Sequence, residues 1–162
     1  MNMVIGNAAD AKQSFSVADL ALMIKDLDDA EKGYNKARSF PGGEERAKRG
    51  LALVAKARDA SQQDLTLATD LSRKKQSASA IDKYHAAIYG NPKVPDSHLG
   101  LAQTLEKVSP ATPRYLREAV AQYKAFMALT PNMPAKEQEK MNKRIASLEE
   151  KAYKLEQKAK KV

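Results

Sequence analysis

The segments KYHAAIYGNP (Lys83–Pro92) and QYKAFMALTP (Gln122–Pro131) decide how this sequence folds, because they repeat one pattern. Each places a Tyr eight residues before a Pro, with small or apolar residues between them. A shorter segment, GYNKARSFP (Gly33–Pro41), has the same pattern with one residue fewer. In a helix, the Ala four residues before each Tyr lies on the same face as that Tyr. The pattern therefore predicts helices that pack an Ala and an aromatic ring against a neighbour and end at a Pro.

The composition is typical of a helical chain that packs through Ala and Leu. Of the 162 residues, 43% are hydrophobic but only 6% are aromatic, and the chain has no Trp and no Cys. A β-sandwich or barrel would need more Val, Ile, Thr and aromatic residues. The lack of Cys excludes a disulfide framework, thiolate metal sites and a cysteine nucleophile. We therefore predict one all-α domain.

The net charge of +8 favours acidic partners such as nucleic acid, an anionic membrane or an acidic protein surface. Acidic and basic residues alternate along most of the chain, however, which is typical of a solvated surface. The clusters Arg46-Lys48-Arg49 and Arg73-Lys74-Lys75 have no adjacent aromatic residue on which a base could stack. Binding to nucleic acid or to an anionic membrane surface is therefore kept as an alternative.

The sequence indicates no transmembrane segment, because no apolar run approaches the roughly 20 residues that a span requires. Its start, MNMVIGNAAD, lacks the basic region and long apolar core of a signal peptide. The compartment stays open: cytoplasmic, or exported or periplasmic if a targeting segment has been removed.

Apolar residues recur at spacings of three and four, which predicts about eight helices with short loops and no strand. Residues 1–13 are predicted to be a disordered lead-in. The first helix is expected to begin near Ser14 or Ser16, and PGG at 41–43 is expected to end the second. The first apolar stripe consists of Val17, Leu20, Ala21, Ile24 and Leu27.

The segment 44–74 fits either one long helix or two. Its apolar stripe turns polar between Arg58 and Gln62. SQQD at 61–64 resembles the capping box that starts a helix, with Asp in place of the usual Glu. We therefore expect two helices here, the first of them covering 44–60.

The helices that precede the two long Tyr segments repeat as well. Leu67-Ala68-x2-Leu71 recurs as Leu101-Ala102-x2-Leu105, with the same offset at all three positions. Each is followed by Ala-x3-Tyr and a Pro, first at Ala80, Tyr84 and Pro92, then at Ala119, Tyr123 and Pro131. The offset matches the period of the tetratricopeptide repeat (TPR), about 34 residues in two helices, with Ala-x3-Phe and Pro in the second helix. Residues 61–131 resemble two such repeats.

The resemblance implies a right-handed α-solenoid of antiparallel helical hairpins in a single domain, 14–162. The sequence departs from the family where Ala replaces the Gly at which paired helices touch and Leu replaces the Tyr. An ordinary antiparallel helical bundle is the alternative. The implied parts are a degenerate repeat at 14–42, an extra helix at 44–60, a repeat at 61–94, a repeat with a loop insertion (SPATP) at 95–134, and a C-terminal capping helix at 135–162.

The C-terminal helix carries a heptad seam about 2.5 repeats long. The seam consists of Met141, Ile145, Leu148, Ala152, Leu155 and Ala159. The terminal helix of a solenoid covers the last hydrophobic face, and that is the expected role. A homodimer through this helix, or docking of an amphipathic partner helix at its far end, is the alternative.

The resemblance also implies a concave groove, lined by the first helix of each hairpin, that binds a peptide or an amphipathic helix of another protein. Chaperone-binding members of the family hold a terminal carboxylate there with Lys, Asn and Arg. In this chain Leu65 and Leu99 stand where that clamp needs polar or cationic residues, so an acidic helix or extended peptide fits better. The expected groove residues are Leu65, Thr69, Ser72, Arg73, Leu99, Gln103, Glu106 and Lys107.

No pattern of catalytic residues stands out. His85 and His98 are the only histidines, and neither has a second metal ligand at helical spacing. We therefore expect no metal, no cofactor and no enzymatic activity. The expected function is a protein-protein interaction scaffold or adaptor, for instance in a bacterial assembly or secretion system. A homo-oligomerising helical bundle is the structural alternative.

Overall fold

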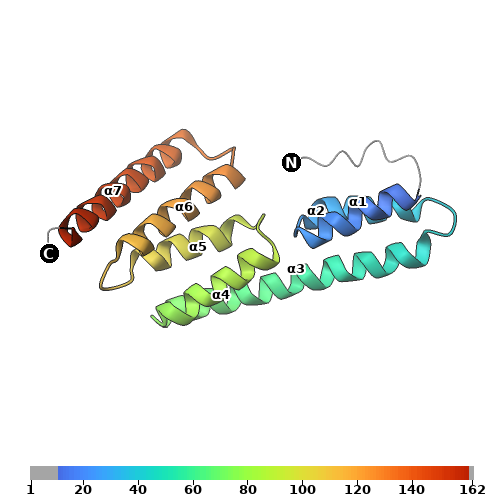
Figure 1. The fold of residues 1–162 in the computed structure, drawn as a ribbon, viewed down its shortest axis with the longest axis horizontal. Helices are drawn as coiled ribbons and strands as arrows, with labels where there is room; N and C mark the ends of the chain where they lie inside the picture. Colours follow the sequence, from blue (N-terminus) through green and yellow to red (C-terminus); the bar gives the residue numbers. More distant parts are fainter. Residues whose placement is uncertain (1–10, 161–162) are drawn as a thin grey trace. The chain divides into compact units, whose positions relative to one another are not determined.

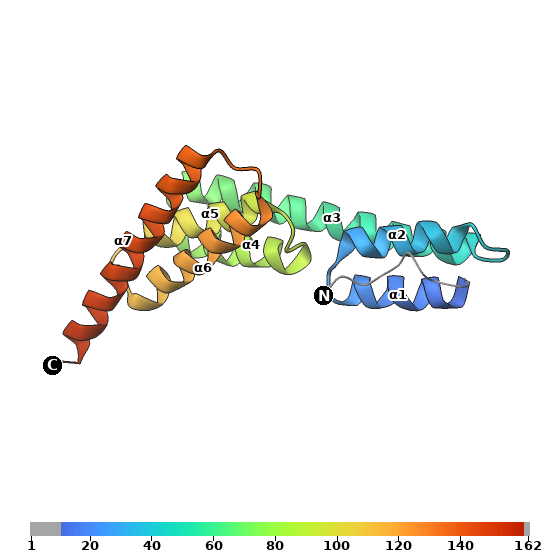
Figure 2. The ribbon, with the colours of Figure 1, turned by 90° about the horizontal axis from the view of Figure 1, so that it is seen from above.

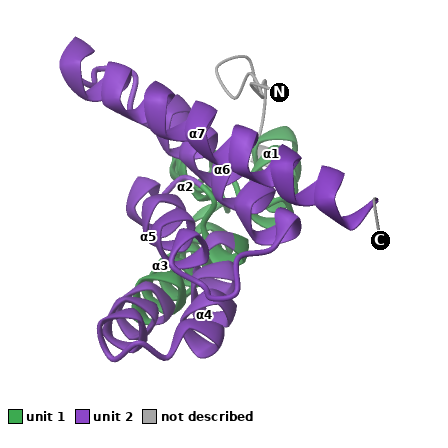
Figure 3. Ribbon diagram, turned by 90° about the vertical axis from the view of Figure 1, so that its left-hand side faces the viewer, with its two compact units in different colours: residues 1–63, 89–92 green, residues 64–88, 93–162 purple. Residues whose placement is uncertain are grey.

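The computed structural model describes residues 11–160, which form two compact units (Figure 3). Unit 1 contains the described residues 11–63 together with 89–92, and unit 2 contains 64–88 together with 93–160. Most of the predicted lead-in, residues 1–10, lies outside the described residues. Residues 11–13 are helical, so the first helix begins earlier than expected.

The all-α prediction is confirmed over residues 11–160, which form helices and no strand (Figure 1). Seven helices are described where about eight were expected. They are α1 (Ala11–Met23), α2 (Leu27–Arg38), α3 (Glu44–Arg73), α4 (Ser77–Gly90), α5 (Pro95–Glu106), α6 (Pro113–Leu129) and α7 (Ala135–Ala159).

The expected break in the segment 44–74 was wrong, because α3 is one helix of 30 residues that contributes to both units. No Gly or Pro follows Gly50 within it, and most of its residues are good helix formers. Arg58, in the polar stretch that suggested a break, forms ion pairs with two acidic residues of α2. Arg58 donates to Glu31 over 2.6 Å and to Asp28 over 2.8 Å.

In unit 1, α1 buries only part of the predicted stripe, which included Ala21 but not Ala18. Leu20 and Ile24 of the predicted stripe are 44% and 54% exposed, whereas Ala18 and Ala21 are fully buried. The small side chains let α2 come close, since a Cβ added to Gly33 would touch the Cβ of Ala18. The core of unit 1 consists of Phe15, Ala18, Ala21, Leu27, Ala30, Tyr34, Ala37, Ala47 and Val54.

In unit 2, the helices α5, α6 and α7 follow one another and pack in chain order (Figure 2). The heptad seam of α7 is used inside the chain, because Ile145, Leu148 and Ala152 are buried in the core of this unit. Two ion pairs of 2.8 Å, Arg117–Glu156 and Lys124–Glu149, hold the polar flank of α7 to α6. The apolar seam of α7 therefore packs within unit 2, and its role as the cap of a solenoid stays a prediction.

One packing contact occurs twice in the chain and links two of the Tyr segments to two glycines. Tyr34 and Tyr84 are 2% and 3% exposed, and each ring lies against a Gly of the following helix, Gly50 or Gly100. A Cβ at either Gly would overlap the ring, so only Gly fits. The segment Gly33–Pro41, taken as the most degenerate copy, therefore packs in the same way as Lys83–Pro92.

The turn that precedes each of these Tyr-bearing helices also recurs. Lys25 and Lys75 have positive φ values of 64° and 59°. The amide of each bonds back to the third residue before it, and the next amide bonds to the fifth residue before itself. This pair of bonds is the Schellman motif that ends a helix. The hairpin α1–α2 therefore has the same turn and the same Tyr–Gly contact as the hairpin formed by the end of α3 with α4.

We expect Gly100→Ala to lower the free energy of unfolding by about 1–3 kcal/mol, because the methyl group must displace the buried ring of Tyr84. Helix propensity alone would favour Ala by about 1 kcal/mol. Urea unfolding followed by circular dichroism measures the change.

The control is the same substitution in a Tyr84→Leu background, where the ring is missing. There Gly100→Ala should cost much less or stabilise the protein. An equal cost in both backgrounds would show that the ring contact does not restrict this position.

Candidate functional site

Unit 2 has an open pocket of 290 Å³ between α5 and α7, which we name the α5–α7 pocket. Residues of α5, the end of α6, the loop after it and α7 form its wall. They are Leu99, Gln103, Phe126, Met133, Glu137, Lys140, Met141 and Arg144.

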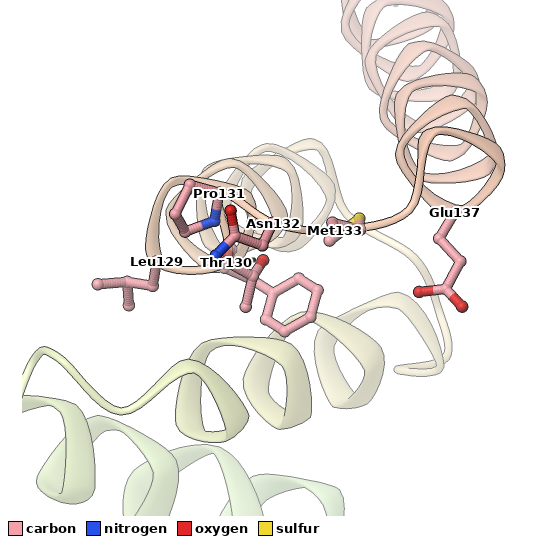
Figure 4. A pocket seen from close by; sticks show the side chains of 7 residues that line it. Leu129, Thr130, Pro131, Asn132, Met133 and Glu137 are labelled. Carbon is pink, nitrogen blue, oxygen red and sulfur yellow. Dashed lines mark hydrogen bonds between the residues drawn. The ribbon is translucent and has the colours of Figure 1, made fainter.

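Helical spacing brings these residues to one place. Leu99 and Gln103 are one turn apart on α5, and the four residues from α7 are spaced by three, four and seven positions from Glu137. The TPNMP loop after α6 places Met133 between the two helices. A neighbouring pocket of 410 Å³ shares Phe126, Met133 and Glu137 with the first and extends it over the end of α6 (Figure 4).

The chemistry of the α5–α7 pocket is that of a site for an apolar side chain with a polar surround. Leu99, Phe126, Met133 and Met141 supply apolar surface, and the two methionines can adapt to different shapes. Lys140, Arg144 and Glu137 give this wall one more positive than negative charge. An apolar side chain could be buried against the four apolar residues, with the charged groups beside it.

A cluster of three polar side chains fixes α7 beside this pocket. The hydroxyl of Tyr123 and Nε of Arg144 each donate to Oε2 of Glu106 over 2.8 Å. The guanidinium of Arg144 also lies 5.6 Å from the centre of the Tyr123 ring. Burial, and then the hydrogen bond to Glu106, raise the pKa of Tyr123 well above its ordinary value. Unit 1 has an equivalent cluster.

In the equivalent cluster of unit 1, Tyr34 donates to Asp19 over 2.6 Å and Arg46 donates to the same carboxylate over 2.8 Å. Burial and then Asp19 raise the pKa of Tyr34 in the same way. Each cluster joins three successive helices, so its role is to hold the packing. The charges of Glu106 and Arg144 are therefore already paired with each other within the protein.

A third pocket of unit 2, of 350 Å³, lies where the ends of α3 and α5 face the start of α4. Its wall consists of Ser72, Lys75, Ser77, Thr104 and Lys107, and we name it the lysine pocket. Within it the hydroxyls of Ser72 and Thr104 are 3.1 Å apart, and the Thr104 hydroxyl donates to the carbonyl of Gly100 over 2.8 Å. Lys75 and Lys107, the two charged residues of the wall, are exposed.

The structure distributes the eight predicted groove residues over several environments. Leu99 and Gln103 line the α5–α7 pocket, and Ser72 and Lys107 line the lysine pocket. Glu106 belongs to the polar cluster described above, and Arg73 is exposed. Thr69 is half-buried and donates to the Leu65 carbonyl over 2.9 Å.

Leu65 is the one predicted groove residue that the structure removes from the surface. It is 8% exposed and belongs to the core of unit 2, while Leu67, assigned to the buried stripe, is 44% exposed. The two leucines are two positions apart and point to different sides of α3. Of the predicted stripe, Ala68 is fully buried and Leu71 packs against the core, so the prediction was wrong only in choosing Leu67 over Leu65.

The sequence prediction missed the part of the α5–α7 pocket that comes from α6, its following loop and α7. Met141 was assigned to the heptad seam, and Met133 was read only as part of a loop that ends a helix. The family resemblance could have indicated it, because it implies that a helix after the last repeat takes the place of a further first helix, and first helices line the expected groove. The length and heptad spacing of α7 drew attention to capping instead.

The two histidines have structural surroundings. His98 is 7% exposed, with Nδ1 at 2.7 Å from Oε1 of Gln122. Nε2 of His85 lies 2.8 Å from Glu118 on the surface. Among residues 11–160, no three His, Cys, Asp or Glu side chains gather as metal ligands would. Within the same residues, no helix combines the length and apolar character of a membrane span.

Comparison with protein-family models and with curated proteins finds no match to this chain. The resemblance to the tetratricopeptide repeat therefore rests on the residues and contacts described above.

We expect the raised pKa values of Tyr34 and Tyr123 to make stability fall at alkaline pH. An unfolded tyrosine ionises near pH 10, whereas these two stay protonated in the folded protein to higher pH. The stability that they contribute is therefore complete below pH 10. Above pH 10, each tyrosine lowers the free energy of unfolding by about 1.4 kcal/mol per pH unit, because it ionises in the unfolded state only. Urea unfolding at pH 8 and at pH 11 measures this loss.

The double variant Tyr34→Phe/Tyr123→Phe should lose less stability between these two pH values than the wild type. The matched control is Tyr89→Phe/Tyr153→Phe, which removes two tyrosines that are 76% and 57% exposed. The control should follow the wild type. Parallel curves for all three proteins would contradict the assignment.

Proposed function

We propose that this chain is a non-enzymatic interaction scaffold that binds a peptide segment of another protein on unit 2. The observation that carries the proposal is the α5–α7 pocket, which presents Leu99, Phe126, Met133 and Met141 beside polar and charged groups. Concave sites with an apolar floor and a few polar groups are the usual form of a binding site. A single apolar side chain of a peptide fits its volume of 290 Å³.

We further propose that the hairpins are tetratricopeptide-like repeats arranged as a right-handed solenoid. The recurrence of the Tyr–Gly contact and of the lysine turn in both units supports a repeated unit. In such an arrangement, the first helices of successive hairpins in unit 2 are the end of α3, α5 and α7. The α5–α7 pocket and the lysine pocket take residues from these helices, which is where a repeat scaffold binds its partner.

The alternatives have less support in the packing. The heptad seam of α7 is largely buried within unit 2, which leaves little of it to pair with a second copy. Of the basic clusters considered for nucleic acid, Arg46 is bound to Asp19, and Lys74 pairs with Asp70 over 2.7 Å. A peptide ligand explains the open apolar surface that neither alternative uses.

The test is selection from a phage library of random dodecapeptides on the immobilised wild-type protein. We expect enriched peptides that share a large apolar residue, because this residue would occupy the α5–α7 pocket. Met133→Lys places a charge in the apolar wall and should abolish the enrichment, as the loss of phage recovery will measure.

The matched control is Met23→Lys, which makes the same change at a 71% exposed methionine of unit 1. This variant should select the same peptides as the wild type. Failure of the wild type to enrich any peptide, or equal effects of the two variants, would overturn the proposed function. Wild-type binding of a short DNA oligonucleotide at low salt, in the absence of peptide selection, would favour the nucleic-acid alternative.

A further inference from the structure

The lysine pocket has an internal counterpart, because the turn that forms it occurs twice in the chain. Lys25 in unit 1 and Lys75 in unit 2 have the same positive φ and the same hydrogen-bonding pattern. When Lys25 is aligned with Lys75, the surroundings of the two turns can be compared position by position.

The comparison shows that the turn of unit 1 is surrounded by apolar residues, whereas the turn of unit 2 is surrounded by polar residues. Four residues of unit 1 correspond to the remaining members of the lysine pocket. In unit 1 they are Leu22, Leu27, Val54 and Ala57, and in unit 2 they are Ser72, Ser77, Thr104 and Lys107. All four apolar residues belong to the core of unit 1 or pack against it, and Leu27 and Val54 are each only 1% exposed.

This difference means that the fold does not require the pocket. The unit 1 copy closes the same turn with apolar side chains and keeps the same backbone conformation. Replacing two leucines by serines in unit 2 removes apolar volume that would otherwise stabilise the core. The result is an opening of 350 Å³ lined by hydroxyl and ammonium groups. A polar cavity at a place where the fold accepts an apolar core indicates a binding role.

The charges of this cavity define the chemistry of its ligand. Lys75 and Lys107 have no carboxylate partner among the described residues, although many other lysines of this chain do, such as Lys74, Lys83 and Lys124. No acidic residue lines the pocket. The charged groups that line the pocket are therefore both positive, which favours a carboxylate as the ligand.

We propose that the lysine pocket binds an acidic side chain, Asp or Glu, of the same peptide whose apolar residue occupies the α5–α7 pocket. The inference rests on the proposed function and specifies its partner as an acidic peptide. Both pockets use α5: Leu99 and Gln103 line one, and Thr104 and Lys107 line the other. Gln103 and Lys107 are one helical turn apart, about 5–6 Å, which a peptide of two or three extended residues spans.

The experiment uses the same library of random dodecapeptides with two kinds of variant. Lys75→Gln/Lys107→Gln removes the charges, and Ser77→Leu fills the pocket with the side chain that unit 1 has at this position. Both variants should still enrich the apolar residue but should lose the enrichment of Asp and Glu near it. For the acidic peptide that the wild type selects most often, fluorescence anisotropy should show binding about tenfold weaker to either variant.

The matched control is Lys136→Gln/Lys151→Gln, which removes two exposed lysines of α7 that line neither of these pockets. This variant has the same net charge as the first double variant and should bind like the wild type. Circular dichroism of every variant establishes that it is folded, and Ser77→Leu is expected to be at least as stable as the wild type.

The outcomes separate the two proposals. Peptides that share an apolar residue but no acid would overturn this inference and leave the proposed function intact. Equal weakening by the α7 control would also overturn it, since the effect would then come from net charge alone. If the wild type enriches no peptide, both proposals fail.

Discussion

The contact between a buried tyrosine ring and a glycine on the next helix is the constraint on which the packing depends. Tyr84 is 3% exposed, and its ring occupies the space that a side chain at Gly100 would need. This contact brings α4 and α5 close together. Gln103 of α5 lines the α5–α7 pocket, whereas Thr104, one turn from Gly100 on the face that meets Tyr84, lines the lysine pocket.

The two clusters of a tyrosine, an acid and an arginine determine which charged groups are already paired within the protein. In each unit, one acid accepts from a tyrosine and from an arginine of the following helix, as Glu106 does from Tyr123 and Arg144. These groups are already satisfied and contribute mainly to the packing. Lys75 and Lys107 lack such partners among the described residues, so they can interact with a ligand at little cost to the fold.

Local patterns predicted the helices and their ends, because Pro, Gly and the Ala-x3-Tyr spacing act within one or two turns. They also predicted that Ala80, Tyr84, Ala119 and Tyr123 would be buried. The continuity of α3 was not predictable from its own residues, since the polar stretch at Arg58 is explained by acids on α2. The candidate site was found only in part, because its wall combines α5, a loop and α7, and the pairing of distant segments is not encoded in any one of them.

Comparing the hairpin α1–α2 with the hairpin of α3 and α4 separates the residues that the packing requires from those that it does not require. What the aligned copies share is packing: the buried Ala and Tyr, the Gly that faces the ring, and the lysine turn. They differ at the start of the second helix, where the first hairpin has Leu27 and the second has Ser77. A leucine there contributes apolar burial of about 1.5–3 kcal/mol, which unit 2 lacks. Since the turn has the same backbone conformation in both copies, the fold does not require this loss, and binding at the opened pocket is the explanation that we propose.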